Sequence, residues 1–132
     1  MLLPPAAHPV YQGSVQLAGS ANNNLLSLGE SALRSIRGSR ISYVFQEPSS
    51  SFNPVFSVKS HLNEILRLKG LPTGDRPDAM AKALQEVGIE PSNEHLQAYP
   101  SAFSGGMLQR LAIACALLAQ PDILVADEPT TA

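Results

Sequence analysis

The sequence predicts an α/β fold in which a small helical insertion interrupts the core. Two short apolar runs, residues 41–45 and 123–126, have the composition of buried strands, and apolar residues with helical spacing fill much of the stretch between them. A chain of 132 residues with 44% hydrophobic content is long enough to bury one small core. Strands that flank a helical middle therefore define the predicted architecture.

The composition argues against two classes of protein. The net charge is −2 and no cluster of Lys and Arg is present, whereas a nucleic-acid-binding protein normally carries a basic face. The apolar run 111–118 is far shorter than the roughly 20 residues that cross a bilayer. Residues 1–5 lack the basic start and long apolar stretch of a secretory signal, so we expect a cytosolic location.

The single cysteine, Cys115, cannot form an intramolecular disulfide. It lies inside the apolar run, with no charged neighbour in sequence that would lower its pKa. Burial as a small hydrophobic side chain is therefore the expected role of Cys115, and not catalysis.

The first third of the chain predicts a strand, a loop, a helix and a second strand. Residues 13–19 alternate apolar with small or polar side chains, which is typical of a short half-buried strand, and residues 22–24 predict a loop. Residues 27–37 carry a helical stripe that Gly38 is placed to end. Residues 41–45 predict a buried strand.

A change of composition to Pro, Ser and Asn over residues 46–54 indicates a loop and a subdomain boundary. Two amphipathic helices are predicted to follow, one on each side of a loop at residues 70–77. Their apolar faces are formed by Val58, Leu62, Ile65 and Leu66 in the first helix, and by Met80, Ala83, Leu84 and Val87 in the second. Gly88 is placed to end the second helix.

Residues 91–102 are polar and predict irregular structure. An apolar helix over residues 105–119 then leads through Gln120-Pro121-Asp122 into the strand 123–126. Most of the candidate ligand-binding residues stand at the two ends of this last helix–strand unit.

Ser104, Gly105 and Gly106 stand directly before and at the start of the apolar helix. A helix N-terminus has unpaired backbone N–H groups and partial positive charge, and glycine allows an anion to approach the backbone closely. This pattern predicts a phosphate site. The alternative is a serine N-cap before a flexible turn, which for these three residues in isolation is the better interpretation.

Two carboxylates, Asp127 and Glu128, follow the strand 123–126. The continuous apolar character of this strand predicts that both of its faces are covered, and open α/β sheets bind ligands at the carboxyl ends of their strands. Asp127 is then placed to hold Mg²⁺, and Glu128 to orient or deprotonate an attacking water. The alternative is an acidic turn at the end of a strand.

Gln46 follows the strand 41–45 and would lie at a carboxyl edge as well. Its carboxamide can bind a metal or a water. The alternative is a solvated loop residue, which is the usual state of a loop glutamine. The presence of the other two motifs favours the ligand-binding interpretation of Gln46.

A series of motifs along nearly the whole chain resembles the oligopeptide, dipeptide and nickel importer ATPases of the ATP-binding-cassette (ABC) family. The motifs that carry this resemblance are Leu2-Leu3-Pro4, residues 13–19, Leu25-Leu26, Ile36-Arg37-Gly38, residues 45–48, Phe52-Asn53-Pro54, Val87-Gly88-Ile89, Tyr99-Pro100, residues 103–107 and residues 126–132. The order of residues 103–110 and 123–129 is that of the family's signature motif and Walker B.

The resemblance implies a partial RecA-like P-loop NTPase core with an inserted helical subdomain. Residues 1–47 would be the N-terminal part of the core, residues 48–103 the helical subdomain, and residues 104–132 the signature helix and Walker B strand. In this family two copies sandwich two ATP molecules with Mg²⁺, so that each site is shared.

The resemblance also assigns roles to single residues. Gln46 would contact Mg²⁺ or the attacking water and Asp127 would serve the metal, while Glu128 would act on the water. Ser104, Gly105 and Gly106 would contact the γ-phosphate of ATP held by the opposite subunit.

The partners implied are a second ATP-binding subunit, identical or not, and transmembrane permease subunits. Residues 52–99 would dock on the permease, which places the protein on the cytoplasmic face of the membrane without insertion into it. No nucleic acid is implied as a partner.

Two features depart from the family pattern. Leu108 stands where the family usually carries a basic residue, and the chain contains no G-x-x-x-x-G-K-[ST] sequence, so it has no P-loop lysine. The chain therefore resembles an internal fragment without Walker A, D-loop and H-loop, and we do not expect hydrolysis by this polypeptide alone. The alternatives are a non-catalytic module that docks on transporter subunits and completes a partner's ATP site, and a degenerate remnant that is not a stable protein.

Overall fold

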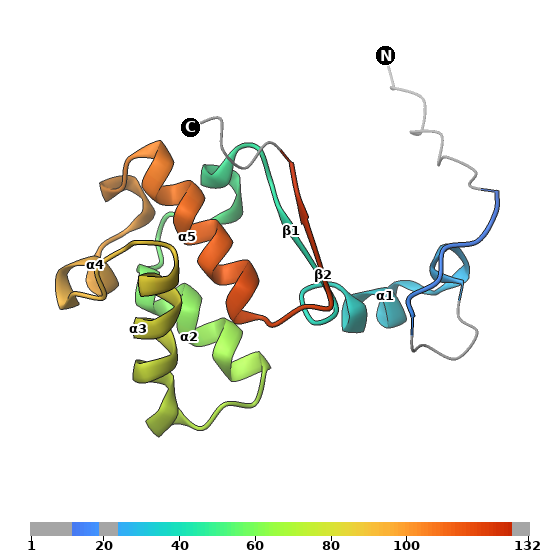
Figure 1. Cartoon of the computed structure of the whole chain (residues 1–132), viewed down its shortest axis with the longest axis horizontal. Coiled ribbons are helices and arrows are strands. Elements are labelled where there is room, and N and C mark those ends of the chain that lie inside the picture. The colour runs from blue at the N-terminus through green and yellow to red at the C-terminus, as the bar shows by residue number, and fades with distance from the viewer. Residues whose placement is uncertain (1–11, 19–23, 128–132) are drawn as a thin grey trace, which may run out of the picture. The chain divides into compact units, whose positions relative to one another are not determined.

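The computed structural model describes residues 12–18 and 24–127 (Figure 1). Two units divide the chain, Met1–Ser35 and Ile36–Ala132. The helices and strands are α1 (Glu30–Ile36), β1 (Ile41–Val44), α2 (Val58–Leu68), α3 (Arg76–Glu86), α4 (Asn93–Gln97), α5 (Gly105–Leu118) and β2 (Ile123–Ala126). Short 3-10 helices include η1 (Leu25–Ser27), η2 (Pro48–Ser51), η3 (Thr73–Asp75) and η4 (Pro100–Ala102).

The strand predicted over residues 13–19 is not present, since residues 12–18 form no strand. Asn24 organises this part of the first unit instead. Its Oδ1 accepts a hydrogen bond from the backbone N–H of Val15 at 2.9 Å, and the backbone N–H of Leu25 donates to the carbonyl of Val15 at 2.8 Å. These bonds close a loop without the partner strand that a ladder requires.

The helix predicted over residues 27–37 is shorter than expected. Residues Leu25–Ser27 form η1, capped by the side chain of Asn24, and Leu28 is extended with φ −74° and ψ 139°. The α-helix therefore begins only at Glu30. It ends before Gly38, whose φ of +75° is the left-handed conformation that glycine adopts without strain.

The two predicted strands β1 and β2 are confirmed, and they pair in parallel. Ile41 pairs with Ile123 and Val44 with Ala126, which fixes the register over all four residues of each strand. An ion pair between Arg40 Nε and Asp122 Oδ2, 2.6 Å apart, joins the residues just before the strands. Parallel pairing requires a long crossover, and here the crossover contains helices α2 to α5.

The expectation that β2 is covered on both faces was wrong. Ile123, Leu124 and Val125 are 43%, 39% and 39% exposed. In β1, by contrast, Ser42 and Val44 are buried while Tyr43 is exposed. Helix α5 packs against β1, which accounts for the buried face of that strand. An apolar run predicts that a strand can be buried, but the layers that bury it come from elsewhere in the fold.

The two predicted amphipathic helices are confirmed as α2 and α3. Ser57 caps α2 through a hydrogen bond from the backbone N–H of Ser60. The buried residues are Val58, Leu62 and Leu66 in α2, and Met80, Ala83 and Leu84 in α3. These are residues of the predicted faces, so the helical spacing in the sequence corresponds to the surface that packs.

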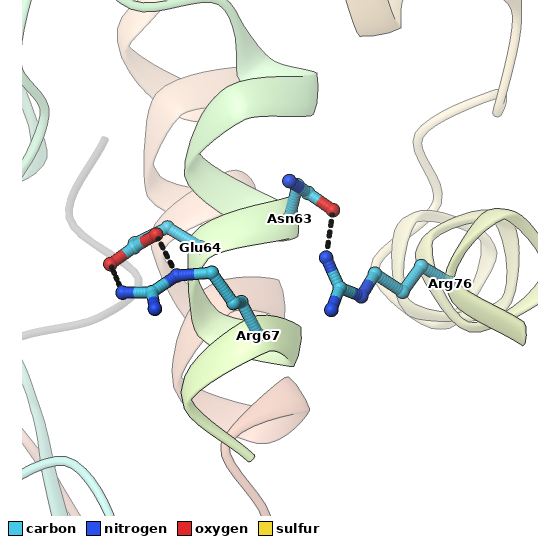
Figure 2. A network of polar contacts seen from close by, with 4 residues as sticks. All are labelled: Asn63, Glu64, Arg67 and Arg76. Atoms are coloured by element: carbon cyan, nitrogen blue, oxygen red, sulfur yellow. Dashed lines mark hydrogen bonds and ion pairs between the residues drawn. The ribbon is translucent and has the colours of Figure 1, made fainter. Parts of the chain in front are cut away.

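Polar contacts join α2 to the start of α3 (Figure 2). Arg76 Nη1 donates to Asn63 Oδ1 at 3.0 Å, and Arg76 Nε donates to the carbonyl of Leu71 at 2.9 Å. One turn further along α2, Arg67 makes two hydrogen bonds to the carboxylate of Glu64. These bonds lower the pKa of Glu64 below its ordinary value.

Residues 91–102 were expected to be irregular, yet they contain α4 and η4. The hydroxyl of Ser92 caps α4 by accepting a hydrogen bond from the backbone N–H of His95 at 3.1 Å. The predicted loop 46–54 likewise contains η2. Helices of three to five residues are too short to show a hydrophobic period, so the pattern did not reveal them.

Helix α5 is central to the core of the second unit. It packs against α2, α3, β1 and η2, and its Leu111 is fully buried together with Leu62 and Leu84. Arg110, on another side of α5, donates to the carbonyl of Gly88 at 3.0 Å. Within residues 12–18 and 24–127 no helix has the length and apolar content needed to cross a membrane.

Candidate functional site

Gln46 and Asp127 lie at the same edge of the two-stranded sheet. Asp127 directly follows Ala126, the residue that pairs with Val44, and the backbone N–H of Asp127 donates to the carbonyl of Val44 at 3.0 Å. Gln46 stands two residues after Val44, and the side chains of Gln46 and Asp127 are both exposed. The predicted placement of these two residues is confirmed, whereas their roles as ligands stay predictions. Glu128 lies outside the described residues.

The carboxylate of Asp127 has one partner that the sequence did not indicate. The hydroxyl of Tyr43 donates to Asp127 Oδ2 at 3.3 Å, and the ring of Tyr43 contacts that of Phe45 with centroids 4.6 Å apart. Desolvation, then the charge of Asp127 and this hydrogen bond, raise the pKa of Tyr43. The phenol therefore keeps its proton and remains a donor to the carboxylate.

The donors at this edge suit Mg²⁺ better than a softer metal. The carboxylate of Asp127 and the amide oxygen of Gln46 are hard oxygen ligands. Among the residues that the structure describes, no group of three or more His, Cys, Asp and Glu gathers at one point. A small number of protein oxygens, with water or phosphate oxygens completing the shell, is the usual arrangement for Mg²⁺.

The turn at Ser104 is confirmed as the start of α5. Ser104 is extended with φ −66° and ψ 161°, and its hydroxyl accepts a hydrogen bond from the backbone N–H of Met107 at 3.3 Å. Gly105 is exposed, and a Cβ added to it would meet nothing within 4 Å. Space in front of the first backbone N–H groups of a long helix suits an anion. The serine is thus an N-cap, and anion binding stays a prediction.

The turn and the strand edge belong to one packed unit. Helix η2 begins two residues after Gln46 and packs against α5. The N-terminal end of α5 and the carboxyl ends of β1 and β2 both lie toward the top of Figure 1, separated in that view. Phe103 and Leu108, on either side of the turn, are buried and hold it on the core.

Cys115 packs against the core cluster and is partly buried. Desolvation raises the pKa of its thiol to about 12. The thiolate is therefore disfavoured at neutral pH, which agrees with the expected role as a hydrophobic side chain and not a nucleophile.

The family model described as ABC transporter matches residues 3–131 of this sequence. The chain belongs to the ABC transporter family. Leu108, the departure from the usual basic residue in the signature motif, is only 9% exposed and packs in the core of this ABC domain.

Curated relatives of this ABC chain share about two fifths of its residues. The dipeptide transport ATP-binding protein DppD of Bacillus subtilis is 42% identical over 132 residues, which are 99% of this chain and 38% of that protein. The oligopeptide transport ATP-binding protein OppD of Salmonella typhimurium is 40% identical over 121 residues, which are 89% of this chain and 36% of that protein. The chain thus spans less than half the length of these relatives.

Solved ABC cassettes share the fold. A dimeric post-hydrolysis state of the ATP-binding cassette MJ0796 bound to ADP and Pi superposes with a TM-score of 0.73 and 28% identity, covering 84% of this chain and 47% of that chain. A second dimeric structure of this cassette gives a TM-score of 0.70 at 27% identity. The predicted fold class, part of a RecA-like ABC ATPase core, is confirmed.

Replacing Ser104 with alanine is expected to lower the free energy of unfolding by about 1 kcal/mol, because the N-cap hydrogen bond to Met107 is lost. Urea unfolding followed by far-ultraviolet circular dichroism measures this change. Ser101→Ala, at an exposed position just before the turn, is the matched control. Equal effects of the two substitutions would contradict a stabilising cap at Ser104.

Proposed function

We propose that this chain functions within the ATP-binding, ATP-hydrolysing subunit of an ABC importer that energises the uptake of peptides or a similar small solute. The observation that carries the proposal is the parallel register of β1 and β2, which brings Gln46 and Asp127 to one carboxyl edge. Ligand sites of open α/β sheets lie at this edge. The relatives named as dipeptide and oligopeptide transport proteins support the class of solute.

At the strand edge, Asp127 would hold Mg²⁺ directly or through water, and Gln46 would contact the metal or the attacking water. Glu128, next along the chain, would orient or deprotonate that water. When bound, Mg²⁺ neutralises charge on the phosphates of ATP. The exposure of Gln46 and Asp127 supports their access to such a ligand.

At the start of α5, the backbone N–H groups of Ser104, Gly105 and Gly106 would face the γ-phosphate of ATP held by a second ATP-binding subunit, identical or not. Two observations support this arrangement. The turn has open space in front of Gly105, and the solved relatives are dimers.

Permease subunits would contact the helical region of residues 52–99 and hold the subunit at the cytoplasmic face of the membrane. Large apolar side chains on this region support a protein partner. Val55, Phe56, Leu68 and Tyr99 are 69%, 52%, 72% and 53% exposed. Exposed apolar side chains of this size are common at protein interfaces.

The test measures ATP-dependent association. The full chain is sedimented alone and mixed with the Bacillus subtilis dipeptide transport relative, with and without ATP, and Mg-ATP turnover is assayed in parallel. We expect a complex that requires ATP and that Ser104→Arg abolishes, while Ser101→Arg leaves it unchanged. Circular dichroism confirms that both variants remain folded.

Three outcomes separate the proposals. Turnover that Glu128→Gln abolishes supports the enzyme. An ATP-dependent complex without turnover supports a non-catalytic module that completes the partner's site. If the chain is folded but shows no complex and no turnover, the proposed function is contradicted.

A further inference from the structure

The contact between Tyr43 and Asp127 follows from the strand register. Tyr43 pairs with Val125, and Asp127 lies two residues beyond Val125. The backbone N–H of Asp127 donates to the carbonyl of Val44, so Asp127 continues the ladder just past the end of β2 and lies on the same face as Val125 and Tyr43. On that face the long side chain of Tyr43 reaches the carboxylate, and its hydroxyl donates to Asp127 Oδ2 at 3.3 Å.

Both the backbone and the ring of Tyr43 are held in place by neighbouring residues. Its backbone belongs to the ladder between β1 and β2, and its ring packs against Phe45 at an interplanar angle of 45°. The backbone of Asp127 is fixed by its hydrogen bond to the carbonyl of Val44. A fixed donor and a fixed aspartate backbone together restrict the rotation of the carboxylate.

The hydrogen bond engages one carboxylate oxygen. A phenol has a single proton to donate, and the acceptor is Oδ2. Asp127 Oδ1 accepts nothing from the phenol and keeps both of its lone pairs for a further ligand. Groups that bond to the second oxygen of a ligating carboxylate orient it and tune its affinity for the metal.

We propose that Tyr43 is a positioning residue for metal binding at Asp127, with its hydroxyl holding Oδ2 and leaving Oδ1 to the cation. This inference rests on the proposed function, in which Asp127 binds Mg²⁺. Tyr43 itself does not bind the metal. Loss of an outer partner of this kind weakens metal affinity by roughly 10- to 100-fold in well-formed sites. At 3.3 Å in an exposed site, we expect a loss at or below the lower end of that range, about 3- to 10-fold.

The experiment measures binding of Mn²⁺, an oxygen-preferring stand-in for Mg²⁺, to the full chain by the electron paramagnetic resonance signal of the free ion, with and without ATP. Tyr43→Phe keeps the ring that packs on Phe45 and removes only the hydroxyl. Tyr99→Phe is the matched control, because Tyr99 is 53% exposed and lies outside the sheet. Asp127→Asn tests the proposed ligand directly.

We expect Tyr43→Phe to raise the dissociation constant for Mn²⁺ about 3- to 10-fold, Tyr99→Phe to leave it unchanged, and Asp127→Asn to raise it further. Unchanged or tighter binding in Tyr43→Phe, together with weaker binding in Asp127→Asn, overturns the positioning role and leaves the proposed function standing. Tighter binding would mean that the hydroxyl competes with the metal for Oδ2. If the chain binds no Mn²⁺, or if Asp127→Asn binds it as the wild type does, both the metal role of Asp127 and the inference fail.

Discussion

Replacing Leu111 with alanine is expected to lower the free energy of unfolding by about 2–5 kcal/mol. Leu111 is 0% exposed and lies in the middle of α5, the helix that packs against α2, α3 and β1. The substitution removes buried apolar surface and leaves a cavity between elements that cannot fully close it. Because domains are stable by only about 5–15 kcal/mol, this is a large share of the total. Urea unfolding followed by circular dichroism at 222 nm measures it.

Leu117→Ala is the control for this substitution. Leu117 lies on the same helix but is 41% exposed, so the same change of residue type removes much less buried surface. The expected loss is under about 1 kcal/mol. Similar losses for the two positions would show that α5 is not packed as the structure describes.

Replacing Gln109 with methionine is expected to raise the free energy of unfolding by about 1–3 kcal/mol. Gln109 is 4% exposed, and among the described residues neither its Nε2 nor its Oε1 has a hydrogen-bond partner. A buried amide without partners has lost its hydration and gained nothing in exchange. Methionine is also unbranched and has similar helix propensity, so it removes the polar atoms with little change in packing. Thermal and urea unfolding both report the difference.

Gln85→Met provides the comparison, because Gln85 is an exposed residue of α3. Its effect is expected to stay within about 0.5 kcal/mol of zero. A loss of stability in Gln109→Met would mean that the amide of Gln109 makes hydrogen bonds in solution. In that case the residue holds a structural water or a further part of the protein.

The longer helices could be predicted from the sequence because the spacing of their apolar residues corresponds directly to the face that packs. In α2, Val58, Leu62 and Leu66 recur every four residues, and all three are buried. The N-caps Ser57 and Ser104 stand directly before the helices that they cap. In such segments the local preference and the final packing agree.

The absence of a strand over residues 13–18 and the exposure of β2 could not be predicted, because both depend on neighbouring elements. Alternation over residues 13–19 is necessary for a half-buried strand, but a strand also needs a partner for its backbone. The apolar run of β2 likewise does not indicate which other elements cover the strand. Helices as short as α4 span little more than one turn, so their residues show no period.

The candidate site could be predicted in part. Gln46 and Asp127 each follow an apolar strand in the sequence, and parallel pairing brings such ends together. Tyr43 was missed because its contact with Asp127 depends on the register, which a single sequence does not specify. Gln109 was missed because a glutamine on an apolar helix gives no sign of whether it faces water. The three-part division at residues 47 and 103 stays a prediction.

The shared core of β1, η2 and α5 has a consequence for how the molecule opens. Val44, Phe52 and Leu108 come from β1, the end of η2 and α5, and all three belong to one buried cluster. Amide protons in such a cooperative unit exchange with solvent only when the unit opens as a whole. Residues 12–18 and 24–35 bury only Leu17, so their amides exchange through local openings of low free energy. We therefore expect a ligand that binds at the strand edge to slow exchange along α5 as well.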